Sequence, residues 1–491
     1  MGAPNTLLIQ RYRTIISYTG IVFVLLGVLT LTPLLALPFF LGEIGCTLGF
    51  VIPAATFILL GLLLRRIFHP KVYVTLTVQE GAVIVLFGWA AAFLSSALPF
   101  MIIIKTPFHL AVFESVSGWT TTGLSILDVT KTPNLVLLWK SITQLAGGAG
   151  LAIIMIGSLA GPAGAGFSIA EGRNDQLLPN VRASAKLVLV IYAGYAVVGI
   201  LAYVAVGMSL FDAVIHTFAA ISTGGFSTHP ENIGYWNSVP VEAVSIVLMI
   251  FGNLNFLTAY ILLRGRFREF AGNGEVRVLF FFILLGACLL FLFVTPELYS
   301  RLGKCARVSV FETVSALTTT GFSTVGYGAW NPVGIFVLTL LMLVGGGTGS
   351  TAGGIKQLRV YLLYKACVWE IRRSLLPRNT VVEYSIRQGE HRVFVSDSLI
   401  RQTGVFLFFY LCVYMVGVLV LAGYGFGLKE SLFEFASALA NAGLSLGLTS
   451  PSCPKPVIWT ETIGMGMGRL EFFIVFTAIG KILRDIRFSR S

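Results

Sequence analysis

Four short segments of the sequence share a glycine that is followed by an apolar residue and then by a serine. The glycines are Gly123, Gly225, Gly321 and Gly443, and they recur after 102, 96 and 122 residues. Each segment ends an apolar stretch of about 10–12 residues, which is too short to cross a bilayer and has the length of a re-entrant half-helix. The repetition predicts four copies of one unit: a helix, a re-entrant loop and a second helix.

Glycine-centred loops of this kind can bind a cation through backbone carbonyls. Glycine permits the torsion angles that turn successive carbonyl oxygens toward one axis. Rings of carbonyls replace the hydration shell of a cation in potassium filters, and each half-helix directs the negative end of its dipole to the same axis. We therefore predict a four-loop selectivity filter. Its candidate potassium ligands are Thr121, Thr122, Gly123, Thr223, Gly224, Gly225, Thr319, Thr320, Gly321, Asn441, Ala442 and Gly443.

The alternative interpretation of the four segments is that they are ordinary glycine-rich turns, alike only through common ancestry. Ordinary turns need neither an apolar half-helix nor a place at membrane depth.

The residue nine positions before each glycine is Glu114, His216, Glu312 or Glu434. These positions suit a helix N-terminus, where the dipole favours acids, or a cation-attracting outer mouth. His216 argues against a symmetric acidic ring.

A glycine run interrupts the apolar stretch at 333–366. We predict a mobile intramembrane gating loop beneath the filter, because each glycine costs a helix about 1 kcal/mol relative to alanine. A kinked helix without a gating role is the alternative. The loop comprises Gly345, Gly346, Gly347, Thr348, Gly349, Ser350, Thr351, Ala352, Gly353 and Gly354. Since no strand precedes the run, its likeness to a dinucleotide-binding loop is weak.

Arg469 lies near the middle of the last apolar stretch and follows the run Gly464 to Gly468. An arginine at membrane depth is costly and generally faces a cavity or a partner. We predict that Arg469 is part of the gate and faces the pore, where its positive charge would discourage tight cation binding. Pairing with a buried acid or with carbonyls is the alternative.

Composition places these segments in a bilayer. The chain of 491 residues is 56% hydrophobic and 11% charged, with a mean hydropathy of +0.86, whereas soluble domains carry about a quarter charged residues. We expect an all-α membrane protein. Apolar runs that could span lie near 15–41, 44–64, 79–104, 134–158, 187–209, 239–263, 276–298, 333–366, 403–425 and 457–480.

Basic residues orient the predicted spans. Of the 34 lysines and arginines, 25 lie at the two termini or in connections on the same side as the termini. Positively charged connections face the cytoplasm, so we predict that both termini are cytoplasmic. This bias accounts for the net charge of +12 without a nucleic-acid partner.

The repeat divides the chain into five parts around one pseudo-fourfold pore. Two extra transmembrane helices occupy residues 1–75, and the first three pore repeats occupy 76–165, 166–265 and 266–370, the third with the gating loop 345–354. A cytoplasmic linker and the fourth repeat occupy 371–491.

The motifs resemble those of a known family. The four loops, the run Gly345–Gly354 with Ile355-Lys356, and Gly468-Arg469-Leu470-Glu471 resemble the membrane subunit of bacterial Trk/Ktr potassium-uptake systems. The resemblance covers the whole chain, and the two extra helices favour the Trk branch. It implies potassium uptake across the cell (inner or plasma) membrane, with potassium bound at the filter glycines and its flow restricted by the gating loop and Arg469. Asn441-Ala442 departs from the threonine or glycine of the other loops.

The resemblance also implies partners. They are a second copy of the chain in a homodimer, with one pore in each subunit, and a cytosolic regulatory ring that binds NAD(H) or adenine nucleotides. Potassium is the transported ion, and no organic cofactor is expected in this chain.

Two other functions compete with a channel-like pore. A sodium- or proton-coupled potassium symporter, or a sodium-permeable relative, would share the fold. Carriers generally place their sites between inverted repeats, whereas the repeats here run in one sense. An enzyme is not expected, because His109, His216 and His229 lack the HExxH spacing of a metal site and the six cysteines form no CxxC pair.

Overall fold

The computed structural model describes residues 3–69, 77–150, 181–377, 383–388, 391–470 and 472–490. These residues are almost entirely helical, apart from one antiparallel pair of strands, β1 (Ser385–Gln388) and β2 (His391–Phe394). Six helical stretches in the described part are long and apolar enough to cross a membrane, and two bent helix pairs raise the number to eight. The predicted all-α membrane fold is confirmed.

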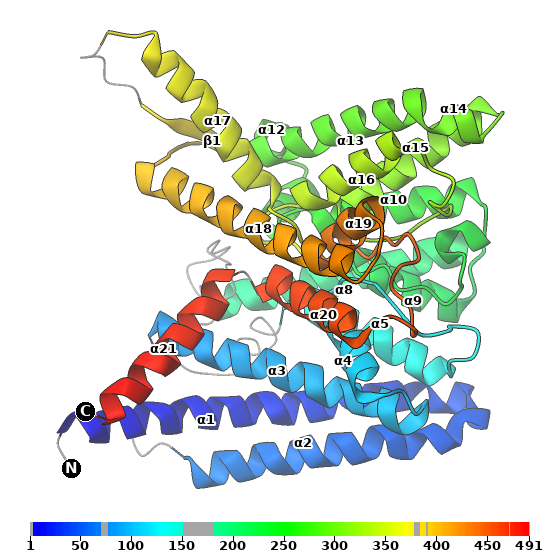
Figure 1. The fold of residues 1–491 in the computed structure, drawn as a ribbon. Coiled ribbons are helices and arrows are strands. Elements are labelled where there is room, and N and C mark those ends of the chain that lie inside the picture. Colours follow the sequence, from blue (N-terminus) through cyan, green and yellow to red (C-terminus); the bar gives the residue numbers. More distant parts are fainter. Residues whose placement is uncertain are drawn as a thin grey trace.

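The N-terminal helices form a hairpin along one side of the molecule. Helices α1 (Ala3–Thr30) and α2 (Thr47–Ile67) are joined by the 3-10 turns η1 (Thr32–Phe39) and η2 (Leu41–Cys46). Gly20 and Gly61 let the two helices approach closely, because a Cβ added to Gly61 would lie 2.5 Å from the Gly20 carbonyl oxygen. The hairpin packs on the next helix, α3, at the lower edge of Figure 1.

Beyond the hairpin, the order long helix, short helix, second helix occurs four times. The long helices are α3 (Val78–Ile103), α8 (Val181–Ala205), α13 (Gly274–Phe293) and α18 (Asp397–Gly423). The short helices are α4 (Phe108–Trp119), α9 (Leu210–Ile221), α15 (Leu302–Leu317) and α19 (Leu428–Leu439). The second helices are α5 (Asn134–Ala149), α10 (Val239–Asn253), α16 (Pro332–Val344) and α20 (Lys455–Leu470). Each second helix packs against the short helix of the next group, and α20 packs against α4 of the first.

The second helices stop after only 13–16 residues. After Asn253 the chain bends by 119° into α11 (Phe256–Leu263), and after Leu470 it bends by 95° into α21 (Phe472–Arg490). The apolar runs predicted at 239–263 and 457–480 are therefore bent helix pairs and not straight helices. The first break is fixed by Asn255, whose side chain caps α11 by accepting from the Leu257 amide at 2.8 Å. Residues 151–158 of the span predicted at 134–158 lie outside the described residues.

The remaining elements cover the ends of the bundle. They are η3 (Asn232–Tyr235), α12 (Phe267–Gly272), α14 (Thr295–Leu298) and α17 (Gln357–Ser374). Helix α17 forms a small second core with the β1–β2 hairpin, through Leu362, Trp369, Ile386 and Val395, and extends at the upper left of Figure 1. The start of α1 and the end of α21 lie close together, since Tyr12 donates to Asp485 at 3.0 Å.

Candidate functional site: a ring of four loops

Each short helix is followed by a loop with the same unusual backbone. Two alternate positions in every loop have positive φ, and the second is the glycine that recurs in the four repeats. The pairs are Thr121 (φ 56°) and Gly123 (93°), Thr223 (54°) and Gly225 (70°), Thr319 (52°) and Gly321 (78°), and Asn441 (55°) and Gly443 (81°). Non-glycine residues adopt this region at a cost of about 1–2 kcal/mol each, so four matched instances mark one shared geometry.

The four loops meet in a closed ring. A Cβ atom added to any of the four glycines would collide with a carbonyl oxygen of the next loop. The added Cβ would lie 2.2 Å from Gly224 O at Gly123, and 2.1 Å from Thr320 O at Gly225, from Ala442 O at Gly321 and from Thr122 O at Gly443. The order is that of the repeats, and the last loop closes on the first. No larger residue fits these positions without movement of the neighbouring backbone.

The acidic or histidine residue nine positions before each glycine holds the segment that follows the filter glycine. All four side chains are buried. Glu114 accepts hydrogen bonds from Ser125 (2.9 Å) and the Ile126 amide (2.6 Å). Glu312 accepts from Thr324 (2.7 Å) and Tyr327 (2.5 Å), and Glu434 accepts from Ser445 (2.5 Å) and the Leu446 amide (3.0 Å). The fourth residue, His216, contacts Ser227 at 2.9 Å. These residues lie inside the short helices rather than in their first turn. Of the two interpretations of these positions, a place at a helix N-terminus is therefore wrong; the side chains bind the chain that follows the filter glycine.

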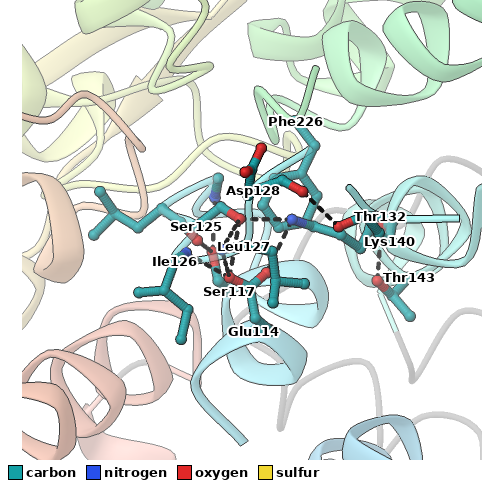
Figure 2. A network of polar contacts seen from close by, with 12 residues as sticks. Glu114, Ser117, Ser125, Ile126, Leu127, Asp128, Thr132, Lys140, Thr143 and Phe226 are labelled. Atoms are coloured by element: carbon teal, nitrogen blue, oxygen red, sulfur yellow. Dashed lines mark hydrogen bonds and ion pairs between the residues drawn. The ribbon is translucent and has the colours of Figure 1, made fainter. Parts of the chain in front are cut away.

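A buried cation, Lys140 of α5, lies beside the first loop (Figure 2). Its Nζ lies 2.9 Å from Glu114 Oε2, donates to Ser125 at 2.7 Å and sits 4.1 Å from the ring centroid of Phe226 in the second loop. Lys140 therefore joins the outer parts of two loops. Sequence reasoning missed it, although a lysine within an apolar run is a signal of a buried partner.

The glycine run 345–354 folds into a compact loop between α16 and α17 rather than a kinked helix. Gly346 N donates to Gly353 O at 3.1 Å, so the two arms of the loop lie together. Ile355 N and Lys356 N donate back to Leu343 O and Val344 O, both at 3.0 Å. The Lys356 ammonium group donates to the Ala352 carbonyl.

The tip of this loop contacts the ring at the end where the short helices stop. Gly353 N donates to Thr319 Oγ1 at 2.7 Å, and Thr223 Oγ1 donates to Thr351 Oγ1 at 3.2 Å. A Cβ on Gly353 would lie 1.9 Å from the Ala440 carbonyl oxygen. The run thus touches the second, third and fourth loops from one side.

Arg469 connects the glycine run to α5. Its Nη1 donates to Thr351 O at 2.6 Å and its Nη2 to Gly147 O at 2.5 Å. Arg469 also lines a cavity of about 50 Å³ that is shared with Gly349 and Ser350 of the run. The structure places Arg469 at the end of α20 rather than in the middle of a straight span, and gives it the carbonyl partners that the sequence left as the alternative.

Comparison with known proteins agrees with this architecture. The family model described as "TrkH: Cation transport protein" matches residues 50–485. A cation transporter of Methanocaldococcus jannaschii is 28% identical over 94% of both chains. The Trk system potassium uptake protein TrkG of Escherichia coli is 31% identical over 82% of this chain and 84% of its own. The crystal structure of the potassium transporter TrkH from Vibrio parahaemolyticus superposes with a TM-score of 0.82 at 26% identity, covering 95% of this chain and 98% of that one.

The helices and the ring of loops, with these similarities, define a polytopic membrane transporter and not an enzyme. The chain belongs to the TrkH family of cation transport proteins.

Proposed function

We propose that this chain carries potassium into the cell through the ring of loops, which acts as a selectivity filter. The observation that supports this function is the closed ring, in which each filter glycine abuts a carbonyl of the next loop. Several carbonyls around one axis can replace potassium's hydration shell. The similarity to relatives such as the Trk system potassium uptake protein TrkG supports potassium as the ion.

In this proposal the predicted filter residues provide the ligands through their backbone. Thr122, Gly224, Thr320 and Ala442 hold the carbonyls that meet the glycines, and their oxygens form one layer of the ion path. The positive φ of the preceding residue in each loop turns a second set of carbonyls toward the same path.

The glycine run and Arg469 act as the gate. The run contacts three of the four filter loops from one side, where it would obstruct an ion that has left the filter. Arg469 holds the run through Thr351 and adds a fixed positive charge beside it. Opening then requires that the run move and that these hydrogen bonds be replaced.

The distribution of basic residues and the resemblance to Trk systems support a wider assembly. Both termini lie in the cytoplasm, together with the basic helix α17, which carries Arg372 and Arg373 in its last turn. A homodimer, with a cytosolic nucleotide-binding ring docked on this face, completes the transport system. The five-part division of the chain into an N-terminal hairpin and four pore repeats belongs to the same proposal.

Uptake of rubidium-86 into proteoliposomes tests the function. We expect uptake that potassium competes strongly and that sodium and lithium compete weakly. Equal competition by sodium would contradict a potassium filter. Single-channel currents would support a pore, whereas saturable flux with a fixed sodium or proton stoichiometry would indicate a symporter.

A further inference from the structure

The four filter loops are not held in the same way. In the first loop Thr120 and Thr122 share a hydrogen bond between their hydroxyls at 2.7 Å, and in the third loop Thr318 and Thr320 do so at 2.8 Å. These pairs tie the residue before the filter glycine to the end of the short helix. The second loop has Ser222 and Gly224 at the two positions. Gly224 has no side chain, so this tie cannot form there.

Gln144 of α5 takes the place of the missing tie. Its side chain is fully buried. The amide Nε2 donates to the Gly224 carbonyl, and Oε1 accepts from the Phe226 amide at 3.4 Å. One side chain thus holds the residues on both sides of the filter glycine Gly225.

Gln144 and Gly224 also fit one another sterically. A Cβ on Gly224 would lie 2.4 Å from Gln144 Cδ, so the glutamine occupies the space that a threonine side chain would need. The Gly224 carbonyl is the one that Gly123 abuts in the ring. Gln144 therefore acts on a carbonyl of the proposed ion path and not on a distant part of the loop.

The other three second helices have methionine at the equivalent position. Counting from the first residue of each helix, Gln144 is the eleventh residue of α5. The eleventh residues of α10, α16 and α20 are Met249, Met342 and Met465, and all three are fully buried. Each second helix packs on the next short helix. The helices with Met249, Met342 and Met465 therefore face the loops with Thr320, Ala442 and Thr122, in that order.

The fourth loop has a different substitute. It has Ala440 and Ala442 in place of the threonine pair. Its Asn441 donates through Nδ2 to Thr122 Oγ1 and to Met465 O, both at 2.9 Å. The second loop is thus the one loop with neither a hydroxyl pair nor an asparagine, and it is the loop that the helix with Gln144 faces.

We propose that Gln144 is a positioning residue that sets the Gly224 carbonyl and thereby contributes to the choice of potassium over sodium. This inference rests on the proposed filter function. A carbonyl oxygen has two lone pairs, so Gly224 O can accept from Gln144 and still face an ion. Without the amide, the Gly224–Gly225 pair has a wide range of torsion angles, and its carbonyl can close around the smaller sodium ion.

The test is paired rubidium-86 and sodium-22 uptake in reconstituted variants. Gln144→Met introduces the residue of the other three helices and removes both hydrogen bonds. We expect the rubidium-to-sodium ratio to fall about fivefold, which corresponds to one ordinary hydrogen bond, while rubidium uptake persists. Met342→Leu, a swap of similar volume at the equivalent position, should leave the ratio unchanged.

A triple variant distinguishes positioning from general damage. Ser222→Thr and Gly224→Thr, combined with Gln144→Met, give the second loop the hydroxyl pair of the first and third loops together with their facing methionine. We expect this variant to fold and to recover most of the ratio lost in Gln144→Met. A triple variant that does not fold, or that keeps the low ratio, would overturn the proposal.

The filter variant Gly123→Ser distinguishes a failure of the Gln144 role from a failure of the filter assignment. If Gly123→Ser lowers the ratio and Gln144→Met does not, the role of Gln144 is wrong and the filter stands. If neither changes the ratio, the filter assignment itself fails.

Discussion

The first and third filter loops and the glycine run 345–354 all place irregular backbone inside the helical bundle, but they differ in how much they depend on distant parts of the chain. In the first filter loop, Thr122 N donates to Ser117 O at 2.9 Å and Ser117 Oγ to Leu124 O at 2.6 Å, so the partners are neighbours in sequence. The third loop repeats both bonds through Ser315.

The glycine run also has local bonds, such as that from Gly346 N to Gly353 O, but distant elements hold it as well. Gly347 N donates to Asn253 O at 3.2 Å, Thr348 N donates to Glu275 at 2.6 Å, and Arg469 donates to Thr351 O. Loops fixed by local bonds keep their shape when neighbours move, whereas a loop fixed by distant partners can be released from them. Selectivity and flow rate should therefore be separable by mutation.

Removal of the glycine run should have the largest effect. Deletion of Gly347 to Gly353 should raise rubidium uptake roughly tenfold or more, as expected when a closed state that dominates a two-state equilibrium is lost. The chain can close over the gap, because a Cβ on Gly345 would lie only 2.6 Å from Gly354 Cα. The rubidium-to-sodium ratio should not change. A folded deletion variant that transports no faster than the parent would remove the gating role.

Gly123→Ser should have the next largest effect, this time on selectivity. The added Cβ would lie 2.2 Å from Gly224 O at a φ of 93°, and strain of ~1–3 kcal/mol should lower the rubidium-to-sodium ratio about tenfold. Gly404→Ser is the matched control, because a Cβ there meets nothing within 4 Å. An unchanged ratio in folded Gly123→Ser, measured by paired rubidium and sodium-22 uptake, would contradict the filter.

Arg469→Ala should raise uptake by a smaller factor, roughly fivefold, because it removes charge-assisted hydrogen bonds to Thr351 and Gly147. The rest of the run keeps its partners, so release is partial. Arg469→Lys retains the charge without the forked donor geometry and should fall between the parent and the alanine variant. Initial rates of rubidium uptake as a function of potassium concentration measure the effect. Rates equal to those of the parent would make Arg469 a structural residue only.

Thr120→Val should have the smallest effect. It removes the hydroxyl that bonds Thr122 at 2.7 Å but leaves the local backbone bonds of the first loop. We expect the rubidium-to-sodium ratio to fall about twofold, less than a full hydrogen bond, with no change in flux. Thr130→Val, at an exposed position, serves as the control. A loss of selectivity as large as that of Gly123→Ser would show that this hydroxyl pair, and not the local backbone bonds, holds the first loop.

The repetition of short apolar stretches and glycines was enough to predict the four loops, because a half-helix and a residue with positive φ both leave local signals. The glycine run was likewise predicted as non-helical from its composition. The break after Asn253 was not predicted, since the surrounding residues are apolar and the bend is fixed by the Asn255 cap. The roles of Glu114 and its counterparts were also not predicted, because their hydrogen-bond partners lie in the segment that follows the filter glycine.

Lys140 and Gln144 were missed for a further reason. Each acts across the boundary between two repeats, and the pattern of a single repeat contains no information about its neighbour. A comparison of the four second helices with one another contains the signal, since Gln144 stands where the others have methionine.

The closed ring has a consequence for how such a protein changes over evolutionary time. In a pore built from four identical subunits, every mutation arrives in four copies at once. Here one chain supplies all four loops, so a mutation alters one quarter while three keep the ancestral arrangement. Loss of symmetry can accumulate one loop at a time, provided that a neighbour compensates. Gly224 with Gln144, and Ala442 with Asn441, are two places in this ring that differ from the threonine pairs of the first and third loops.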